Sequence, residues 1–444
     1  MAFFLYFWSP NFDNNKKEKM KRLVNRYIPC TLLLGSLVLA SCRSKDVFDE
    51  EFYKQAVEIA QPVQGIDNSH TWELSSTHYI TVETGGFSDM QRLQILSGNP
   101  AAKEGALILG DYPLSGEGRE YVAFACPSVL RKYYAALVDD KGTYTLTAFT
   151  SDDRSIDFSS PVATRATVDE RLVGLQAYTY CYEGEMPEPG DYDYNEVVLR
   201  VSQERTANDQ ITLNVTLAAV GAQSQIAAAI RLSDFKYSDI VSVTTVDNES
   251  FDTGYKKSAL PFIDGNDLLL EGLDGSAVIN VFEDAHWATD QIGYASEGYI
   301  PRYMYNVSKF TSEEFEMMPP RTVSFVITFK NPLVLNYFTL ESIDPFAIIE
   351  YNGGLMENHA VYKYKTLSVL HEYSQPEGAS ILPWALTVPL GTFRYPLSGE
   401  HIGYAKDGAL FGAYMTSGHA FGQWAASKDA ATDWYNYPTN NMVY

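Results

Sequence analysis

The chain has 444 residues and is poor in cysteine and histidine, with four and seven respectively. None of the histidines has the HExxH or HxH spacing of zinc sites. The GxSxG elbow of hydrolases and the Walker glycine loop are also absent. These absences argue against zinc, serine-nucleophile and nucleotide chemistry. Glycoside hydrolysis by a pair of carboxylates stays an open alternative, because the fold sets the distance between the two groups.

Positive charge is scarce as well. Lysine and arginine number 33 against 56 aspartates and glutamates, so the net charge is −23. Such a surface repels phosphates and anionic headgroups and concentrates cations. We therefore expect no nucleic-acid partner.

Long apolar runs are missing except near the N-terminus, where an apolar segment spans residues 27–40 and ends in Ser41 and Cys42. Six basic residues precede it, and it is too short to span a bilayer as a stable anchor. The pattern resembles the bacterial lipobox, which implies cleavage before Cys42 and acylation of its thiol and new amino group. Residues 1–41 are the expected signal peptide. Met20 is the expected start, because the aromatic leader before the basic residues fits no part of a signal.

Cleavage and acylation at Cys42 determine the expected location of the protein and which cysteines remain free to react. Residues 1–41 contain six basic and two acidic residues, so their removal changes the net charge from −23 to −27. The lipid on Cys42 would hold the protein in the outer membrane, facing the periplasm or, more favoured, the cell surface. Cys126 and Cys181 remain, either as a disulfide or as buried free thiols.

The residue pattern predicts an all-β fold with a short N-terminal helix. Tyrosine and phenylalanine are abundant, at 31 and 23 residues, and such side chains favour strands. Residues 42–64 are expected to form a lipidated helical tether. Short alternating segments then predict a β-sandwich over residues 65–160, a polar linker around 160–167, and a larger β domain over 166–444.

The most specific internal motif is the acidic turn GDYDYNE, which begins at Gly190. Asp191, Asp193 and Asn195 place oxygen-bearing side chains at alternate positions, and Glu183 and Glu196 are candidates to complete the set. Calcium prefers six to eight such oxygens, so the spacing predicts a calcium site. The turn is not an EF-hand, because the EF-hand glycine and terminal glutamate are missing. An acidic turn that only caps a strand is the alternative.

The segments YCYE and GDYDYNEVV resemble the LruC-domain family of bacterial surface lipoproteins, whose signature is an aromatic-Glu-Asp segment followed by an Asp-x-Asp-[Tyr/Phe]-Asn-Asp turn. The resemblance implies a surface lipoprotein with an LruC-like β domain. Two positions differ: Glu196 replaces the final acid of the turn, and Gly184 replaces the upstream aspartate, so one potential ligand is absent. Further similar segments are Ile66–Leu74, Val278–Ala288, Pro383–Leu397 and Asp433–Pro438.

Two other groups of residues are candidates for function. Glu283, Asp284 and His286 follow an expected strand and could bind a metal or transfer protons, or could simply satisfy backbone donors at the strand end. Aromatic side chains could stack on sugar rings, although most such residues pack in cores. The tryptophans in question are Trp287, Trp384, Trp424 and Trp434.

Together these features predict a non-enzymatic, membrane-anchored binding or adhesion module with a calcium-stabilised acidic turn. Its expected partners are the membrane, through the lipid on Cys42, and a glycan or a surface protein. The first alternative is a carbohydrate-binding accessory lipoprotein of a surface glycan system. The second is a hydrolase with unrecognised catalytic carboxylates.

Overall fold

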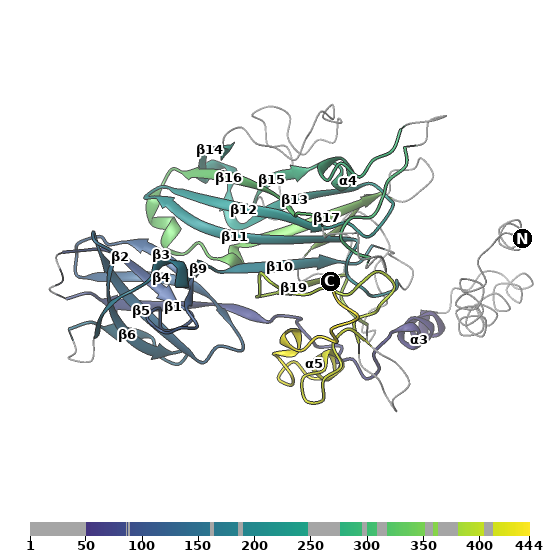
Figure 1. Ribbon diagram of the computed structural model, residues 1–444, viewed down its shortest axis with the longest axis horizontal. Coiled ribbons are helices and arrows are strands. Elements are labelled where there is room, and N and C mark those ends of the chain that lie inside the picture. The colour runs from purple at the N-terminus through teal and green to yellow at the C-terminus, as the bar shows by residue number, and fades with distance from the viewer. Residues whose placement is uncertain are drawn as a thin grey trace, which may run out of the picture. The chain divides into compact units, whose positions relative to one another are not determined.

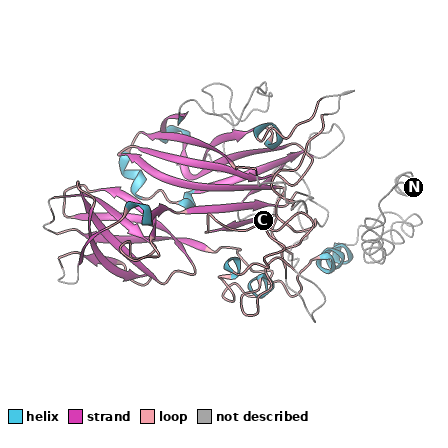
Figure 2. Ribbon diagram, in the orientation of Figure 1, coloured by secondary structure: helices cyan, strands magenta, loops and turns pink. Residues whose placement is uncertain are grey.

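The computed structural model describes residues 50–85, 87, 89–159, 164–184, 190–246, 276–294, 300–308, 318–350, 358–362, 381–403 and 412–444. Strands dominate these residues and helices are few, which confirms the all-β class (Figure 2). The signal peptide and Cys42 lie outside the described residues. The expected N-terminal helix is α3 (Glu50–Ala60). None of the described helices has the length and hydropathy needed to cross a membrane.

Residues 55–444 form one compact unit, and the described residues in it form four sheets (Figure 1). The first pair comprises a three-stranded sheet of order β4-β1-β7 and a six-stranded sheet of order β8-β6-β5-β2-β3-β9. The strands are β1 (Ser75–Glu83), β2 (Met90–Leu96), β3 (Ala106–Pro113), β4 (Arg119–Pro127), β5 (Lys132–Asp139), β6 (Thr143–Thr150), β7 (Ser155–Asp157), β8 (Thr164–Thr167) and β9 (Val173–Leu175).

Alternating apolar residues hold this first pair of sheets together. Ile80 and Val82 of β1 pack against Leu93 and Ile95 of β2 in one buried cluster, as period-two alternation requires. The predicted linker contains β8, which pairs with β6. After it, β9 runs parallel to β3 in the same sheet, so residues up to 175 belong to this sandwich.

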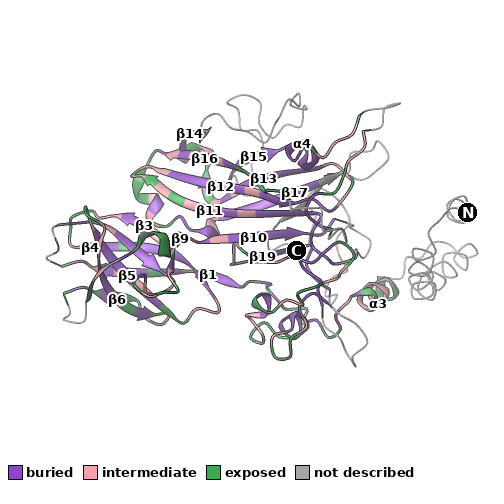
Figure 3. Ribbon diagram, in the orientation of Figure 1, coloured by how far each residue is buried: buried purple, intermediate pink, exposed green. Residues whose placement is uncertain are grey.

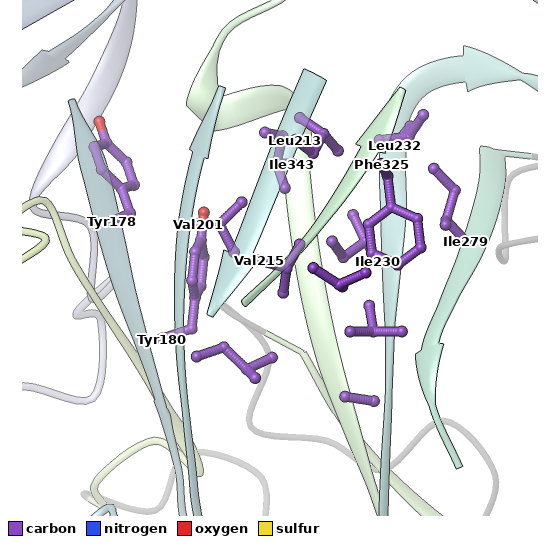
Figure 4. Packing of buried hydrophobic residues seen from close by; sticks show 14 of the residues in the cluster. Tyr178, Tyr180, Val201, Leu213, Val215, Ile230, Leu232, Ile279, Phe325 and Ile343 are labelled. Atoms are coloured by element: carbon purple, nitrogen blue, oxygen red, sulfur yellow. The ribbon is translucent and has the colours of Figure 1, made fainter. Parts of the chain in front are cut away.

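The second pair comprises a six-stranded sheet of order β14-β16-β12-β11-β10-β19 and a four-stranded sheet of order β15-β13-β17-β18. Their facing side chains form the largest buried cluster, seen in Figure 4, to which Leu213, Phe325 and Ile230 contribute. The strands are β10 (Ala177–Tyr182), β11 (Val197–Ala207), β12 (Gln210–Ala219), β13 (Ile226–Lys236), β14 (Ile240–Thr245), β15 (Ser276–Phe282), β16 (Arg321–Phe329), β17 (Ile343–Glu350), β18 (Asn358–Tyr362) and β19 (Ala385–Val388).

Helical elements are short. They are α4 (Ala285–Ala288), α5 (Phe421–Ala426) and the 3-10 turns η2 (Glu170–Leu172), η3 (Tyr237–Asp239), η5 (Pro332–Asn336), η6 (Leu340–Ser342) and η7 (Trp434–Asn436). Buried residues run along the strands of both pairs of sheets (Figure 3).

A third core covers the other face of the β10–β12 strands. Its residues come from the segment after α3, from those strands and from the C-terminal region, so both ends of the described chain meet there. His70 donates from Nε2 to the Trp424 carbonyl at 3.0 Å, and its Nδ1 accepts from the Trp72 amide at 2.8 Å. This pattern requires the neutral imidazole, and burial lowers the pKa of His70 accordingly.

The two cysteines in the described part of the chain are free and buried. The Cys126 thiol lies 2.7 Å from the Tyr133 hydroxyl, and Cys181 is in the third core. Of the two alternatives left open by the sequence, the structure has buried thiols rather than a disulfide.

Candidate functional site

The acidic turn lies beside the ends of two neighbouring strands of the six-stranded sheet. Glu183 follows β10, and its amide donates to the Trp384 carbonyl at 2.9 Å. Glu196 immediately precedes β11, and its carbonyl accepts from the Gly221 amide at 3.0 Å. Since β10 and β11 pair in the sheet, these two glutamates are placed by the strand register.

Four of the five predicted ligands come together here. Glu183, Asp191, Asp193 and Glu196 each offer a carboxylate oxygen, and these oxygens lie within 4.8 Å of one another. The fifth residue, Asn195, uses its side-chain amide to hold the turn, donating from Nδ2 to the Pro396 carbonyl at 3.0 Å.

The backbone of the turn adopts an unusual conformation. Tyr192 and Tyr194 have positive φ values of 55° and 53°, which bulky residues rarely adopt and which costs about 1–3 kcal/mol each. Their side chains are anchored: the Tyr192 hydroxyl accepts from Gln61 Nε2 at 2.6 Å, and the Tyr194 hydroxyl donates to the Pro383 carbonyl at 2.7 Å. Packing therefore maintains a strained turn whose alternating aspartates approach one point.

Two glycines allow the close approach of side chains at this site. A Cβ atom on Gly190 would lie 2.1 Å from Glu183 Oε1, and one on Gly221 would lie 2.0 Å from Asn195 Oδ1. Neither position has space for another residue without movement of the turn.

The site is both buried and negatively charged. The exposed fractions of Glu183, Asp193 and Glu196 are 0%, 2% and 8%, whereas Asp191 lies at the exposed rim. Burial, and next the charge of Asp191, raises the pKa of Asp193 to about 8. Burial and the neighbouring carboxylates raise the pKa of Glu196 well above its usual range, and loss of hydration raises that of Asp191.

Backbone amides satisfy part of this carboxylate set. Asp193 accepts from the amides of Gly399 at 3.0 Å and Asn195 at 3.2 Å, and Glu183 Oε2 accepts from the Tyr194 amide at 3.3 Å. No hydrogen-bond donor among the described residues reaches Oε2 of Glu196, although this atom is buried. A buried carboxylate oxygen without a donor is rare and reduces stability unless it gains a partner.

The second polar cluster stabilises a chain turn. Asp284 caps α4 by accepting from the His286 amide at 2.9 Å, and it also accepts from Arg302 Nε at 3.0 Å. The His286 ring is fully buried, with Nδ1 3.1 Å from Asp284 Oδ1 and Nε2 2.9 Å from the Ala222 carbonyl. Of the two alternatives for Asp284 and His286, this geometry favours the structural one. Glu283 is partly buried beside them.

We expect the change Asp284→Asn to lower the free energy of unfolding by about 2 kcal/mol, because the amide keeps the cap but loses the charged partner of Arg302. Asp290→Asn, at an exposed ion pair with Arg321, is the matched control and should cost less than about 0.5 kcal/mol. Urea unfolding of both variants measures the difference. Equal losses would contradict the structural role.

The candidate sugar-stacking tryptophans are mostly internal. Trp384, Trp424 and Trp434 are 6%, 0% and 0% exposed, which leaves no free ring face for a sugar, and Trp287 is partly buried.

Sequence reasoning missed the residues that reach the turn from a distance. These are Gln61, which contacts Tyr192, and the loop residues Pro396 and Gly399, which contact Asn195 and Asp193. In the sequence, Pro383–Leu397 carries a family resemblance but no sign of a contact with the turn. No local signal marks a contact across some two hundred residues of sequence.

The fold and the site define a β-rich protein with two pairs of packed sheets and an all-oxygen acidic centre. The family model described as "Domain of unknown function (DUF4842)" matches residues 209–435, and the chain belongs to this family. The match begins after the acidic turn and includes Gly221 and Gly399. It does not name the LruC domain, so that resemblance stays a prediction.

The chain is similar in structure to a presumed lipoprotein from Bacteroides ovatus, with a TM-score of 0.45 and 12% sequence identity, over 80% of this chain and 99% of that one. No curated protein matches the sequence.

Proposed function

We propose that the protein is an exported lipoprotein, anchored through Cys42 in the outer membrane, whose β-rich body is a non-enzymatic binding or adhesion module stabilised by calcium. The ion binds to Glu183, Asp191, Asp193 and Glu196. The convergence of these four carboxylates is the observation that carries the proposal.

The size of the cluster suits one calcium ion. Oxygens bound at ~2.3–2.6 Å to the same ion can be at most about 4.6–5.2 Å apart, and the four carboxylate oxygens lie within 4.8 Å. The donors are all hard oxygens, which suit calcium better than zinc or copper. Four carboxylates supply between four and eight oxygens, and the exposed rim at Asp191 leaves access for water ligands.

The charge of the site also favours a divalent cation. Without one, folding must keep some of these carboxyls protonated or place like charges together, and both reduce stability. A bound ion offsets the repulsion and gives the Glu196 Oε2 atom a partner. Since the turn joins β10 to β11, the ion would stabilise the sheet that supports the third core.

The test is thermal unfolding of the purified protein at pH 8, with a chelator and with excess calcium. Calcium at about 100 times its Kd should stabilise the fold by about 2.7 kcal/mol. The Asp191→Ala plus Asp193→Ala variant should lose this response. Asp193→Asn should also lose it, while being more stable than the parent in chelator because one buried charge is removed.

Asp140→Asn, which removes an exposed carboxylate elsewhere, is the matched control and should keep the full response. Magnesium and manganese added alone test the choice of ion, and a weaker shift is expected for magnesium because it gives up its water ligands reluctantly. Absence of any calcium-dependent shift in the parent protein would remove the proposal.

A further inference from the structure

The outer face of the three-stranded sheet β4-β1-β7 carries two exposed tyrosines. Tyr79 on β1 and Tyr121 on β4 are 60% and 52% exposed. Their chain neighbours Ile80 and Val122 belong to the buried cluster of the first pair of sheets. Because successive side chains of a strand point to opposite faces, both tyrosines point away from that core and into solvent.

The strand register brings the two tyrosines close together. Tyr79 is paired with Ala123, and Tyr121 is paired with Thr81, so the tyrosines are diagonal neighbours on adjacent antiparallel strands. Diagonal neighbours of this kind are about 7–8 Å apart. Ala123 and Thr81 are too small to cover an aromatic ring. The two tyrosines therefore form an open aromatic surface, which we call the tyrosine platform.

The charges at one end of the platform disfavour an anionic ligand. Glu83 and Arg119 are paired two residues further along the strands and form an ion pair at 2.5 Å, and Arg119 Nη1 also donates to the Tyr121 hydroxyl at 3.4 Å. Asp157 of β7 is paired with Glu83 and accepts from the amide and hydroxyl of Ser159 at 2.8 and 2.6 Å. The one guanidinium of this group is thus already neutralised, and a second carboxylate remains to repel anions.

The size of the platform and the charge of the chain also argue against a second copy of the protein as the partner. The exposed parts of two tyrosines amount to roughly 170–280 Å². A stable protein interface buries about 800 Å² on each partner. Two copies would also each carry a net charge of −23, and a net charge far from zero keeps proteins monomeric.

An uncharged sugar chain matches these features. The face of an aromatic ring is electron-rich and attracts the C–H groups on the face of a sugar ring. Sugar hydroxyls both donate and accept, so they can bind the tyrosine hydroxyls and the Thr81 hydroxyl beside them. An open sheet face also admits the middle of a long chain, whereas a closed pocket would admit only an end.

We infer that the tyrosine platform binds an uncharged polysaccharide, with sugar rings stacked on Tyr79 and Tyr121. The inference gives the proposed binding module a site and a ligand class. It rests on that binding role but not on the calcium centre. Failure to bind a polysaccharide would therefore leave the calcium response intact, and a failed calcium test would leave the platform unaffected.

The test is affinity electrophoresis of the purified protein in native gels that each contain one soluble polysaccharide. The neutral probes are starch, dextran, xyloglucan, galactomannan, mannan and laminarin, and polygalacturonate is the anionic comparison. At least one neutral polysaccharide should retard the protein, and polygalacturonate should not.

The variants Tyr79→Ala and Tyr121→Ala should each weaken this binding about 10-fold, because each removes one stacking ring. Tyr79→Phe keeps the ring and should bind nearly like the parent. Tyr294→Ala, at a 99% exposed tyrosine that follows α4, is the matched control and should leave binding unchanged. Thermal unfolding checks that each variant is folded.

Three results would overturn the inference: no neutral polysaccharide retards the protein, the folded alanine variants migrate like the parent, or polygalacturonate binds as tightly as the neutral probes. Sedimentation of the parent and of the two alanine variants tests the other occupant. Self-association that the variants lose, without polysaccharide binding, would assign the platform to a second copy and would also overturn the inference.

Discussion

In the presence of a chelator, the free energy of unfolding should fall as the pH is raised from 5 to 8. An aspartate in the unfolded chain has a pKa near 3.9, whereas the folded protein raises that of Asp193 to about 8. Between these values the folded state holds more protons than the unfolded state, so stability decreases with increasing pH. Each unit of pKa shift corresponds to about 1.4 kcal/mol. Asp193 alone should therefore lower the free energy of unfolding by several kcal/mol between pH 5 and 8.

Calcium should remove most of this pH dependence. Protons and the ion compete for the same carboxylates, so calcium should stabilise the protein strongly at pH 8 and hardly at all at pH 5. Urea unfolding at several pH values, with and without calcium, measures both effects. Asp193→Asn should make the curve in chelator less steep, and the raised pKa values of Glu196 and Asp191 should maintain the remaining slope. A parent protein whose stability rises between pH 5 and 8 in chelator would show that the buried carboxylates do not repel as described.

The sequence identified much of this site because the relevant information is local. The alternate spacing of Asp191, Asp193 and Asn195 directs polar side chains into one turn, and Glu183 and Glu196 lie at the ends of the adjoining strands. What the sequence could not indicate is which of these oxygens face one another. Asn195 is used for holding the turn rather than lining the carboxylate cluster, a choice made by its contacts with Pro396 and Gly221.

As with the site, local sequence patterns predict part of the fold, and contacts between distant segments determine the rest. Period-two alternation predicted most strands, because each buries one face. The polar segment around residue 160 gave no alternation, yet β8 forms there because β6 offers an edge for pairing. The Gly- and Trp-rich C-terminal region has no such alternation, and its described elements include the short helical elements α5 and η7. Its lack of regular structure concealed its contribution to the third core, since aromatic packing needs no sequence period.

The change Trp434→Ala should have one of the largest effects on stability, a loss of about 3–5 kcal/mol in the free energy of unfolding. Trp434 is fully buried, and its ring packs edge-on against Tyr414 and Phe421 at centroid distances of 4.9 Å each. It also stacks with Trp424 at 5.7 Å. Removing the indole leaves a cavity that these rigid rings cannot fill by relaxing.

Tyr294→Ala, at a 99% exposed aromatic residue, is the control for Trp434→Ala and should stay within about 0.5 kcal/mol of the parent in urea unfolding. The calcium response should weaken as well in Trp434→Ala, because Tyr192 and Tyr194 of the acidic turn belong to the same buried cluster as Trp434. Those two residues have positive φ values that packing must maintain. Loosening the core therefore relaxes the turn and separates its aspartates. A Trp434→Ala protein with unchanged stability, or with lower stability but a full calcium shift, would show that the core and the turn are independent.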